Sequence, residues 1–390
     1  MRILIPYPYY HEDSGGVPNV IANFSREAAR MGHRVTIVTT RRADEPGQQL
    51  IDGVSIVRFP FRHALMFRRL RDYPRFGRLV RAALASGRLE RPDVIYGISF
   101  GADAGIGGPL AYRSAAGPVR WEWDMWQELW RRGWCHANPL KRLAMRVDFL
   151  LQARLEARCT RSARCLVCHS KDIADGFRKE YGIAAPVHTP CTGVDVKRFL
   201  PGRKAAAKRE LGITGPVLFF SGGFSIQKGA KVVEESLPFI VRRHPDVCVI
   251  IAGKPTHIMD LPADLAAHVR YLGHVRHALL PRHYAAADVF IFPTVQNEGF
   301  PNSVLEAMAS GLPVVISRIP GIEEYIQHGR NGIVVPKYDA EAFAQAVCGL
   351  LDDKKRRASL GAAARQTSLD FAWPKVVRDI LSFLSQTFNA

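Results

Sequence analysis

Val247-Cys-Val-Ile-Ile251 is a short run in which every residue is apolar. A strand with one face in water alternates apolar and polar residues, so an unbroken apolar run indicates a strand that is buried on both faces. Strands of this kind are typical of parallel sheets that helices cover on both sides. The segment therefore predicts a parallel sheet in the second half of the chain.

Comparable runs lie on both sides of this segment and alternate with stretches of helical periodicity. Strands and helices that alternate at this spacing predict a doubly wound α/β fold. The expected strands of the first half are 2–7, 34–40, 55–60, 93–99, 119–123, 165–170 and 187–191, and those of the second half are 217–223, 247–253, 269–273, 288–293, 313–317 and 332–336.

The chain of 390 residues is long enough for two cores. A break lies near residues 195–209, where Pro201-Gly202 precedes a short helical stretch, a turn and a new apolar strand. We predict a Rossmann-like domain over residues 1–198 and a second one over 199–373. The amphipathic stretch 374–390 has no strand after it, and we expect it to pack back on the first domain as a helix.

The composition favours an anionic partner. The chain carries 54 Lys and Arg against 36 Asp and Glu, a formal net charge of +18. Such an excess suits a nucleotide, a phosphorylated glycan or an anionic membrane, and no nucleic-acid recognition motif accompanies it. No apolar run approaches the roughly 18 residues that cross a bilayer. Seven cysteines fit reduced thiols, so we expect a cytoplasmic protein, with peripheral contact to the inner face of the cell membrane left open.

The segment Asn297-Glu298-Gly-Phe-Pro-Asn-Ser-Val-Leu-Glu306 carries the strongest functional signal. It follows an expected strand and leads into an expected helix over 303–310. It therefore lies at the carboxyl edge of a parallel sheet, where open α/β sheets bind ligands. Carboxylates accept hydrogen bonds from sugar hydroxyls, and amides at a helix N-terminus attract phosphate. One loop can thus hold a sugar and its diphosphate, whereas two glutamates at this spacing alone are usual on a solvated helix face.

This segment resembles the Glu–seven residues–Glu motif of the retaining glycosyltransferases of family 4. That family has the GT-B fold, in which two Rossmann-like domains face a central cleft. The resemblance extends over nearly the whole chain and is loosest between about residues 40 and 160. Further matches follow in the family's order: Gly15-Gly16, Gly32-His33-Arg34-Val35, Gly193-Val194-Asp195, Lys228-Gly229, Gly311-Leu-Pro313 and Gly329-Arg-Asn331-Gly332.

The resemblance implies a role for each matching residue. Glu306 would hold the donor ribose, and Glu298 would contact the transferred sugar. Lys228 would neutralise the leaving diphosphate, on which negative charge builds up as the glycosidic bond breaks. Gly15 and Gly16 would approach the same phosphates from the first domain. The other donor contacts would come from the backbone of Val275, Gly299, Phe300, Pro301, Asn302 and Ser303.

Two positions depart from the family's pattern. The family usually has an Arg where this chain has Gly223, so this loop brings only Lys228 to the diphosphate. Lys254, after the next strand, is our candidate for the second cation; an ordinary surface lysine is the alternative. Relatives carry a His near the end of the expected strand 119–123, where this chain offers Asp124 or Glu122. Either carboxylate would orient the acceptor hydroxyl or serve as a structural cap.

Two clusters leave alternatives open. Trp at positions 121, 123, 126, 130 and 134 predicts core packing, a lipid interface or a wall for an acceptor sugar. Nine arginines within residues 62–91 predict a solvated helix, or a surface toward a membrane or an acceptor phosphate.

No metal or haem site is expected. Cys165-Leu-Val-Cys168-His169 spells the attachment pattern of c-type haem, which we reject because the segment reads as a buried strand. No second ligand pair has a spacing that suits zinc, and the loops expected to bind the donor contain no Asp-x-Asp cluster.

The sequence thus predicts a retaining glycosyltransferase without cofactor or metal. It would transfer a hexose-type sugar from a nucleoside-diphosphate sugar, with UDP the commonest nucleotide in the family, to a glycan or lipid-linked acceptor. Surface polysaccharide or lipopolysaccharide biosynthesis is the expected setting. The alternatives are a nucleotide-sugar epimerase or hydrolase of the same fold, a natural-product glycosyltransferase and an inactive partner subunit.

Overall fold

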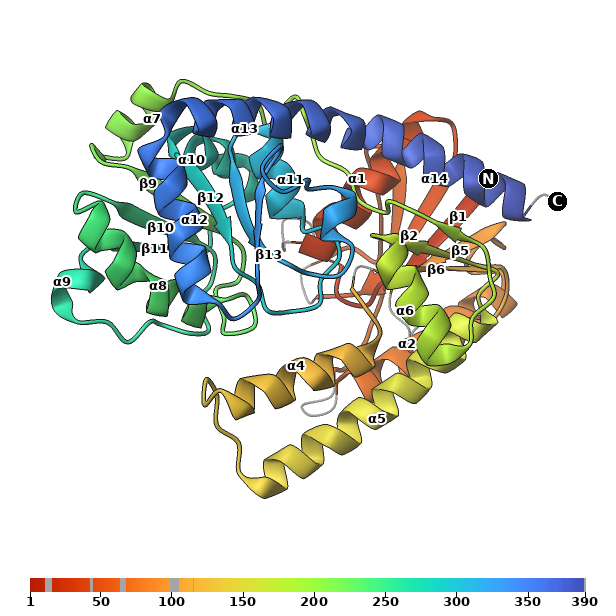
Figure 1. The fold of residues 1–390 in the computed structure, drawn as a ribbon. Helices are drawn as coiled ribbons and strands as arrows, with labels where there is room; N and C mark the ends of the chain where they lie inside the picture. Colours follow the sequence, from red (N-terminus) through yellow and green to blue (C-terminus); the bar gives the residue numbers. More distant parts are fainter. Residues whose placement is uncertain (11–15, 43–44, 64–67, 99–104, 115, 389–390) are drawn as a thin grey trace. The chain divides into compact units, whose positions relative to one another are not determined.

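The computed structural model describes residues 1–10, 16–42, 45–63, 68–98, 105–114 and 116–388. The chain divides into two compact units, each built on its own sheet (Figure 1). The first unit comprises Met1–Trp130, His136–Thr192 and Trp373–Ala390, and the second comprises Arg131–Cys135 and Gly193–Ala372.

The sheet of the first unit has eight strands in the order β3-β4-β2-β1-β5-β6-β7-β8. All neighbouring pairs are parallel except β3 with β4. The strands are β1 (Arg2–Pro6), β2 (Arg34–Thr40), β3 (Gln48–Ile51), β4 (Val54–Phe59), β5 (Val94–Gly97), β6 (Leu110–Ser114), β7 (Cys165–Cys168) and β8 (Val187–His188).

Six described helices complete the first unit. The last of them packs against the first, and its Phe383 ring stacks on His188 of β8 with 5.3 Å between ring centroids. The chain therefore returns to its first sheet after passing through the second unit. The helices are α1 (Gly16–Arg30), α2 (Arg68–Ala85), α4 (Val119–Arg131), α5 (Pro139–Ser162), α6 (Lys171–Tyr181) and α14 (Trp373–Phe388).

The sheet of the second unit is wholly parallel, with the order β11-β10-β9-β12-β13-β14. Its central strands are buried at every position and apolar except at Ser221, as the run at 247–251 predicts. The expectation of a parallel, doubly wound sheet is confirmed here. The strands are β9 (Val217–Ser221), β10 (Cys248–Ala252), β11 (Val269–Gly273), β12 (Val289–Phe292), β13 (Val314–Ser317) and β14 (Ile333–Val335).

Helices lie on both faces of this second sheet (Figure 1). An aspartate side chain caps the N-terminus of two of them. Asp339 accepts a hydrogen bond from the amide of Ala342, and Asp353 accepts one from the amide of Arg356, both at 2.8 Å. The helices are α7 (Lys204–Glu210), α8 (Ala230–Arg243), α9 (Ala263–Ala266), α10 (Leu280–Ala286), α11 (Asn302–Ala309), α12 (Ala340–Asp352) and α13 (Lys354–Ser368), with 3-10 turns at His277–Leu279, Ile322–Glu324 and Leu369–Phe371.

The prediction of a strand at 119–123 is wrong, because these residues form the first turns of α4. The cause lies on another helix. Glu156 of α5 is buried and accepts a hydrogen bond from the amide of Val119 at 2.8 Å, which caps the helix start. Burial raises the pKa of Glu156 to about 7, although the bonds from Val119 and from the hydroxyl of Tyr181 oppose this. A cap supplied from a distant helix leaves no local signal.

Two strands were not anticipated. β3 is short and largely exposed, and it pairs with β4 through a turn at Asp52-Gly53, both of which have positive φ. β6 contains Arg113, which interrupts the apolar pattern. The guanidinium of Arg113 is buried and donates to the carbonyl of Cys191 at 3.1 and 3.2 Å.

Candidate functional site

The second sheet reverses its strand order between β9 and β12, which are neighbours although two strands separate them in sequence. In open α/β sheets, ligands bind at the carboxyl ends of the strands beside such a reversal. The loop after β9 contains Lys228, and the loop after β12 contains Glu298. Topology therefore brings together the two segments that carry the strongest sequence motifs.

Backbone contacts fix the Lys228 loop against the end of β12. The carbonyl of Gln227 accepts hydrogen bonds from the amides of Val295 and Gln296 at 2.9 and 3.1 Å, and from the hydroxyl of Thr294 at 3.2 Å. Gly229 has φ 89°, and a Cβ there would lie 2.0 Å from the carbonyl oxygen of Pro293. Only glycine allows this approach, so the residue beside Lys228 sets the position of the loop.

Lys228 and Glu298 form an ion pair in which the ammonium donates to Oε2 of Glu298. The other oxygen, Oε1, accepts a hydrogen bond from the hydroxyl of Thr294 at 2.8 Å. The side chains of Lys228 and Glu298 are 27% and 15% exposed, so both remain accessible from one side. The structure thus places a cation and an oriented carboxylate next to each other at the edge of the sheet.

A second lysine, which was not predicted from the sequence, lies beside this pair. Nζ of Lys337, just after β14, donates to Oδ1 of Asn297 at 2.6 Å. Burial lowers the pKa of Lys337 to about 8, and the negative charge of Glu298 partly opposes this shift. No sequence pattern links position 337 to position 298, because their proximity depends on the packing of β14 in the sheet.

Glu306 lies on α11 and is nearly buried. Its Oε1 lies 2.7 Å from Nε2 of His277, and its Oε2 accepts a hydrogen bond from the hydroxyl of Tyr284 at 2.8 Å. Burial, followed by the charge of Glu306, raises the pKa of Tyr284 well above its usual value. A carboxylate has about four lone-pair sites, so a carboxylate held by two donors can still accept hydrogen bonds from a ligand. Neither partner was predicted from the sequence.

The residues that follow Glu298 contribute their backbone rather than their side chains. The ring of Phe300 is fully buried and stacks on Tyr325 with 4.4 Å between centroids. Gly299 and Pro301 are buried as well, and Asn302 and Ser303 begin α11. No side chain caps this helix. The positive end of the helix dipole lies at this N-terminus, so a negative group bound there would be stabilised.

Glycines bring the ends of β9 and β10 together on the other side of the site. Gly253 has φ 149°, and a Cβ there would lie 1.8 Å from the carbonyl oxygen of Gly222. Gly223 has open space around it, because a Cβ at this position would have its nearest neighbour, the carbonyl oxygen of Lys254, 3.9 Å away. The side chain of Lys254 is exposed, and Val275 is half-buried after β11.

The expected site residues of the first unit that the structure describes lie on helices. Gly15 lies outside the described residues, and Gly16 is exposed at the first position of α1. Asp124 is exposed on α4, and Glu122 is half-buried in the first turn of that helix. The sequence places Asp124 near the end of a strand. That placement is wrong, because both carboxylates lie on helix α4.

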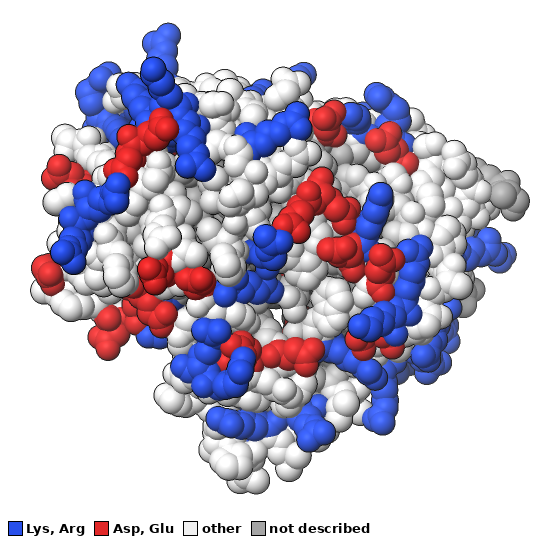
Figure 2. Space-filling model, in the orientation of Figure 1, with Lys and Arg blue, Asp and Glu red and all other residues white. Residues whose placement is uncertain are grey.

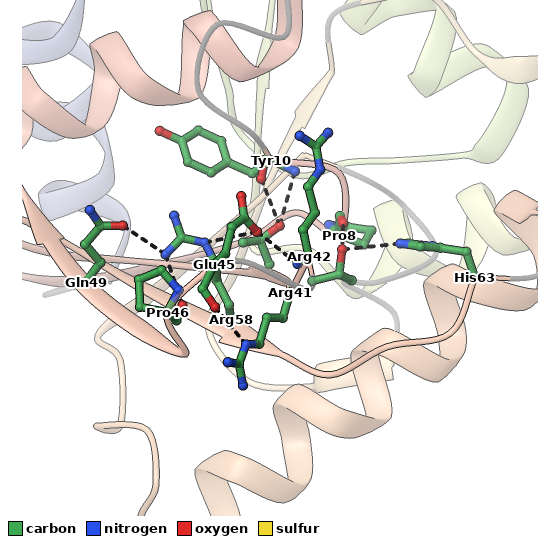
Figure 3. A network of polar contacts seen from close by, with 11 residues as sticks. Pro8, Tyr10, Arg41, Arg42, Glu45, Pro46, Gln49, Arg58 and His63 are labelled. Carbon is green, nitrogen blue, oxygen red and sulfur yellow. Dashed lines mark hydrogen bonds and ion pairs between the residues drawn. The ribbon is translucent and has the colours of Figure 1, made fainter.

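The carboxyl edge of the first sheet carries a polar network of its own (Figure 3). Arg58 at the end of β4 contacts Glu45 and Gln49, at 3.5 and 3.2 Å. The hydroxyl of Thr40 at the end of β2 donates to the carbonyl of Pro8 at 2.6 Å. These contacts tie β4 to β3 and to the segment after β2, and the end of β2 to the segment after β1.

Two of the tryptophans, Trp121 and Trp123, pack against neighbouring segments. The ring of Trp121 fills the space above Gly117 and Gly176, where a Cβ would lie 2.1 and 2.4 Å from it. Trp123 contacts Trp130 at 5.5 Å and Phe149 of α5 at 5.8 Å between centroids, which joins α4 to α5. Trp121 and Trp123 thus pack against neighbouring segments of the chain, and all five tryptophans of residues 121–134 are half-buried, outside the core.

The Cys165–His169 segment behaves as core. Both cysteines of this segment are buried in β7, where burial raises the thiol pKa of Cys165 to about 12 and holds that of Cys168 well above its usual value. Nε2 of His169 lies 3.2 Å from the guanidinium of Arg113. Within the described ranges, no cluster of three His, Cys, Asp or Glu side chains has a geometry that suits a metal ion.

Comparison with known families decides the classification. The family profile described as Glycosyl transferases group 1 matches residues 215–353, and the one described as Glycosyltransferase Family 4 matches residues 14–198. The chain belongs to glycosyltransferase family 4. The first of these matches contains the Lys228 loop, the Glu298 loop and α11.

Individual proteins agree with this classification. This family 4 glycosyltransferase is 28% identical over 385 residues to phosphatidyl-myo-inositol mannosyltransferase of Mycolicibacterium smegmatis, a match that covers 98% of this chain and 92% of the relative. Sucrose-phosphate synthase from Thermosynechococcus elongatus superposes with a TM-score of 0.80 at 19% identity, covering 100% and 99% of the two chains. Anabaena HepE in complex with UDP and glucose superposes with a TM-score of 0.74 at 18% identity, covering 99% and 100%. These two structural likenesses show the GT-B fold of two Rossmann-like domains.

Proposed function

We propose that this glycosyltransferase moves a hexose-type sugar from a nucleoside-diphosphate sugar with retention of the anomeric configuration. The observation that carries the proposal is the Lys228–Glu298 pair at the strand reversal of the second sheet. The bond from the anomeric carbon to the diphosphate oxygen would break while the ammonium of Lys228 stabilises the departing negative charge. The acceptor oxygen would bond to the same face of that carbon, and its proton would pass to the leaving phosphate.

Glu298 fits the role of sugar contact. Its Oε1 is fixed by Thr294, and its Oε2 faces Lys228. When the diphosphate engages Lys228, Oε2 becomes available to hydroxyls of the transferred sugar. The amides at the start of α11 would add hydrogen bonds to the sugar and phosphates from Gly299, Phe300, Asn302 and Ser303.

Glu306 fits the role of ribose clamp. His277 and Tyr284 hold its two oxygens in fixed directions, at 2.7 and 2.8 Å. A preoriented carboxylate binds a pair of ribose hydroxyls without the entropy cost of ordering a free side chain. The base would then lie toward Val275, along the end of β11.

Lys254 is proposed as the second phosphate ligand, because Gly223 offers no side chain. Its ammonium group is exposed. If Lys254→Ala leaves donor affinity and turnover unchanged, Lys254 is a surface lysine and this part of the proposal is wrong.

Two cationic groups and a helix N-terminus can neutralise a diphosphate, so we propose that transfer needs no divalent metal. Turnover should then be the same in EDTA as in magnesium. A loss of activity in EDTA that magnesium restores would overturn this point.

We propose a glycan or lipid-linked acceptor, in the assembly of a surface polysaccharide or lipopolysaccharide at the inner face of the membrane. The net charge of +18 favours anionic, phosphate-bearing acceptors. The mycobacterial relative acts on a phosphatidyl-myo-inositol, as its name states. Within the described ranges, no helix is long and apolar enough to cross a membrane.

A donor screen by calorimetry tests the proposal. UDP-, GDP- and ADP-sugars are titrated into the protein, and the best ligand is then incubated with and without acceptor. We expect tight binding of a UDP-sugar and turnover that depends on acceptor. Turnover of the nucleotide sugar alone would instead favour a hydrolase or epimerase.

A further inference from the structure

Helix α5 has an exposed apolar face opposite to its buried face. Five large aliphatic side chains lie on this face, and their spacing of three or four residues places them along one side of the helix. They are Leu140, Leu143, Val147, Leu150 and Leu151, which are 77%, 59%, 48%, 49% and 41% exposed. The buried side is formed by Gln152, Ala153, Glu156, Cys159 and Thr160. Single exposed leucines are common, but five in one column mark an interaction surface.

This column, residues 140–151 of α5, is presented by a well-anchored helix. Asn138 caps the start by accepting a hydrogen bond from the amide of Lys141 at 2.8 Å, and Pro139 occupies the first helical position. Farther along, buried Glu156 accepts a hydrogen bond from the hydroxyl of Tyr181 at 2.7 Å. The leucines are therefore held in place, and their exposure does not result from a frayed helix end.

Positive charge surrounds the apolar column. The same side of α5 continues with Arg154, Arg158 and Arg161, all exposed. The first turns carry three further exposed cations, Lys141, Arg142 and Arg146. Against these six cations α5 has only two acidic residues, Asp148 and the buried Glu156. At the lower edge of Figure 2, where Figure 1 draws α5, the surface is white and blue.

We propose that the exposed face of α5 lies on the surface of an anionic lipid bilayer. The apolar column is about 17 Å long at 1.5 Å per residue, which suits a helix lying in the plane of the interface. Its leucines would enter the acyl boundary, and the flanking cations would contact lipid phosphates. The inference deepens the proposed function, because a lipid-linked acceptor is presented by such a surface.

Charge argues against a second copy of the chain as the occupant. Two α5 helices packed antiparallel along their whole length would bring Arg154 of one copy opposite position 147 of the other, next to Arg146, and Arg158 opposite position 143, next to Arg142. Like charges at such an interface repel, whereas anionic headgroups attract all of them.

Vesicle sedimentation tests the inference. The full chain is mixed at low salt with vesicles of phosphatidylglycerol and phosphatidylcholine, and in parallel with phosphatidylcholine alone. Leu143→Ser/Leu150→Ser removes apolar contacts, and Arg154→Gln/Arg158→Gln removes charge. The matched control is Leu50→Ser/Phe239→Ser, which replaces two exposed apolar residues that lie outside α5 and are 74% and 59% exposed. Thermal unfolding verifies that all variants fold.

We expect wild type and control to bind the anionic vesicles, with partitioning that falls as salt rises. Each α5 double variant should partition at least roughly tenfold less. The inference is wrong if wild type stays in the supernatant, or if the leucine variant binds as wild type does. It is also wrong if light scattering finds a dimer that dissociates into monomers when the leucines are substituted. Donor calorimetry on the same samples is independent of lipid, so failure of the membrane inference and failure of the proposed function are separable.

Discussion

Replacing Lys228 by Ala should slow transfer far more than it destabilises the protein. The ammonium is the cation of the Lys228 loop, and the side chain is 27% exposed, so solvent weakens its field only in part. Removing one positioned group that stabilises developing charge costs about 3 kcal/mol, or roughly 150-fold in kcat/KM. Glu298 keeps its bond from Thr294 in this variant. The loss of folding stability should therefore stay at about 1 kcal/mol.

The assay compares kcat/KM for the best nucleotide sugar with the unfolding midpoint of each variant. Lys231→Ala is the matched control, because Lys231 is 23% exposed and pairs with Glu234 on the same helix. It removes a comparable ion pair and should leave kcat/KM unchanged. Lys228→Arg keeps the charge and should recover part of the activity. Equal kcat/KM in Lys228→Ala and Lys231→Ala would refute the role assigned to Lys228.

Three further predictions concern the same site. Lys254→Ala should weaken donor binding, measured by calorimetry, by up to about fivefold, the range for an exposed cation; unchanged binding makes Lys254 a surface residue. Lys337 loses its proton as pH rises through about 8, so transfer activity should fall there as the positive charge beside Glu298 disappears. The Lys337→Met variant should not show this fall in its pH–rate profile. A profile identical to that of the wild type would contradict the assignment. The pKa of Lys337 is higher in the unfolded chain than in the folded one. Between these two pKa values the unfolded chain binds more protons, so the contribution of Lys337 to folding stability rises with pH. Tyr284→Phe should cost about 1.5–3 kcal/mol in denaturant unfolding and weaken ribose binding, because Glu306 loses a donor; wild-type donor affinity would count against the clamp.

The sequence alone predicted those features that a local residue pattern determines. The run at 247–251 predicts a doubly buried strand because no side chain there tolerates water, and β10 is that strand. The resemblance to family 4 also singled out Lys228 and Glu298. Lys228 lies seven residues after the end of β9 and Glu298 six residues after the end of β12, and parallel strands end at one edge of the sheet.

Features that depend on distant contacts could not be predicted. The start of α4 is capped by Glu156 from α5, so Val119 and its neighbours resemble a strand when considered alone. His277 of the 3-10 turn His277–Leu279 and Tyr284 of α10 reach Glu306 of α11 only in the folded chain. The apolar column of α5 resembles ordinary core sequence, and only its exposure in the folded chain reveals it.

The central claim is that one diphosphate is bound between Lys228 and the start of α11, with its ribose on Glu306. A crystal structure with the best nucleotide sugar from the donor screen measures this directly. We predict a phosphate oxygen within hydrogen-bonding distance of Nζ of Lys228 and ribose hydroxyls on the carboxylate of Glu306. A nucleotide bound elsewhere, or a diphosphate out of reach of Lys228, would contradict the account.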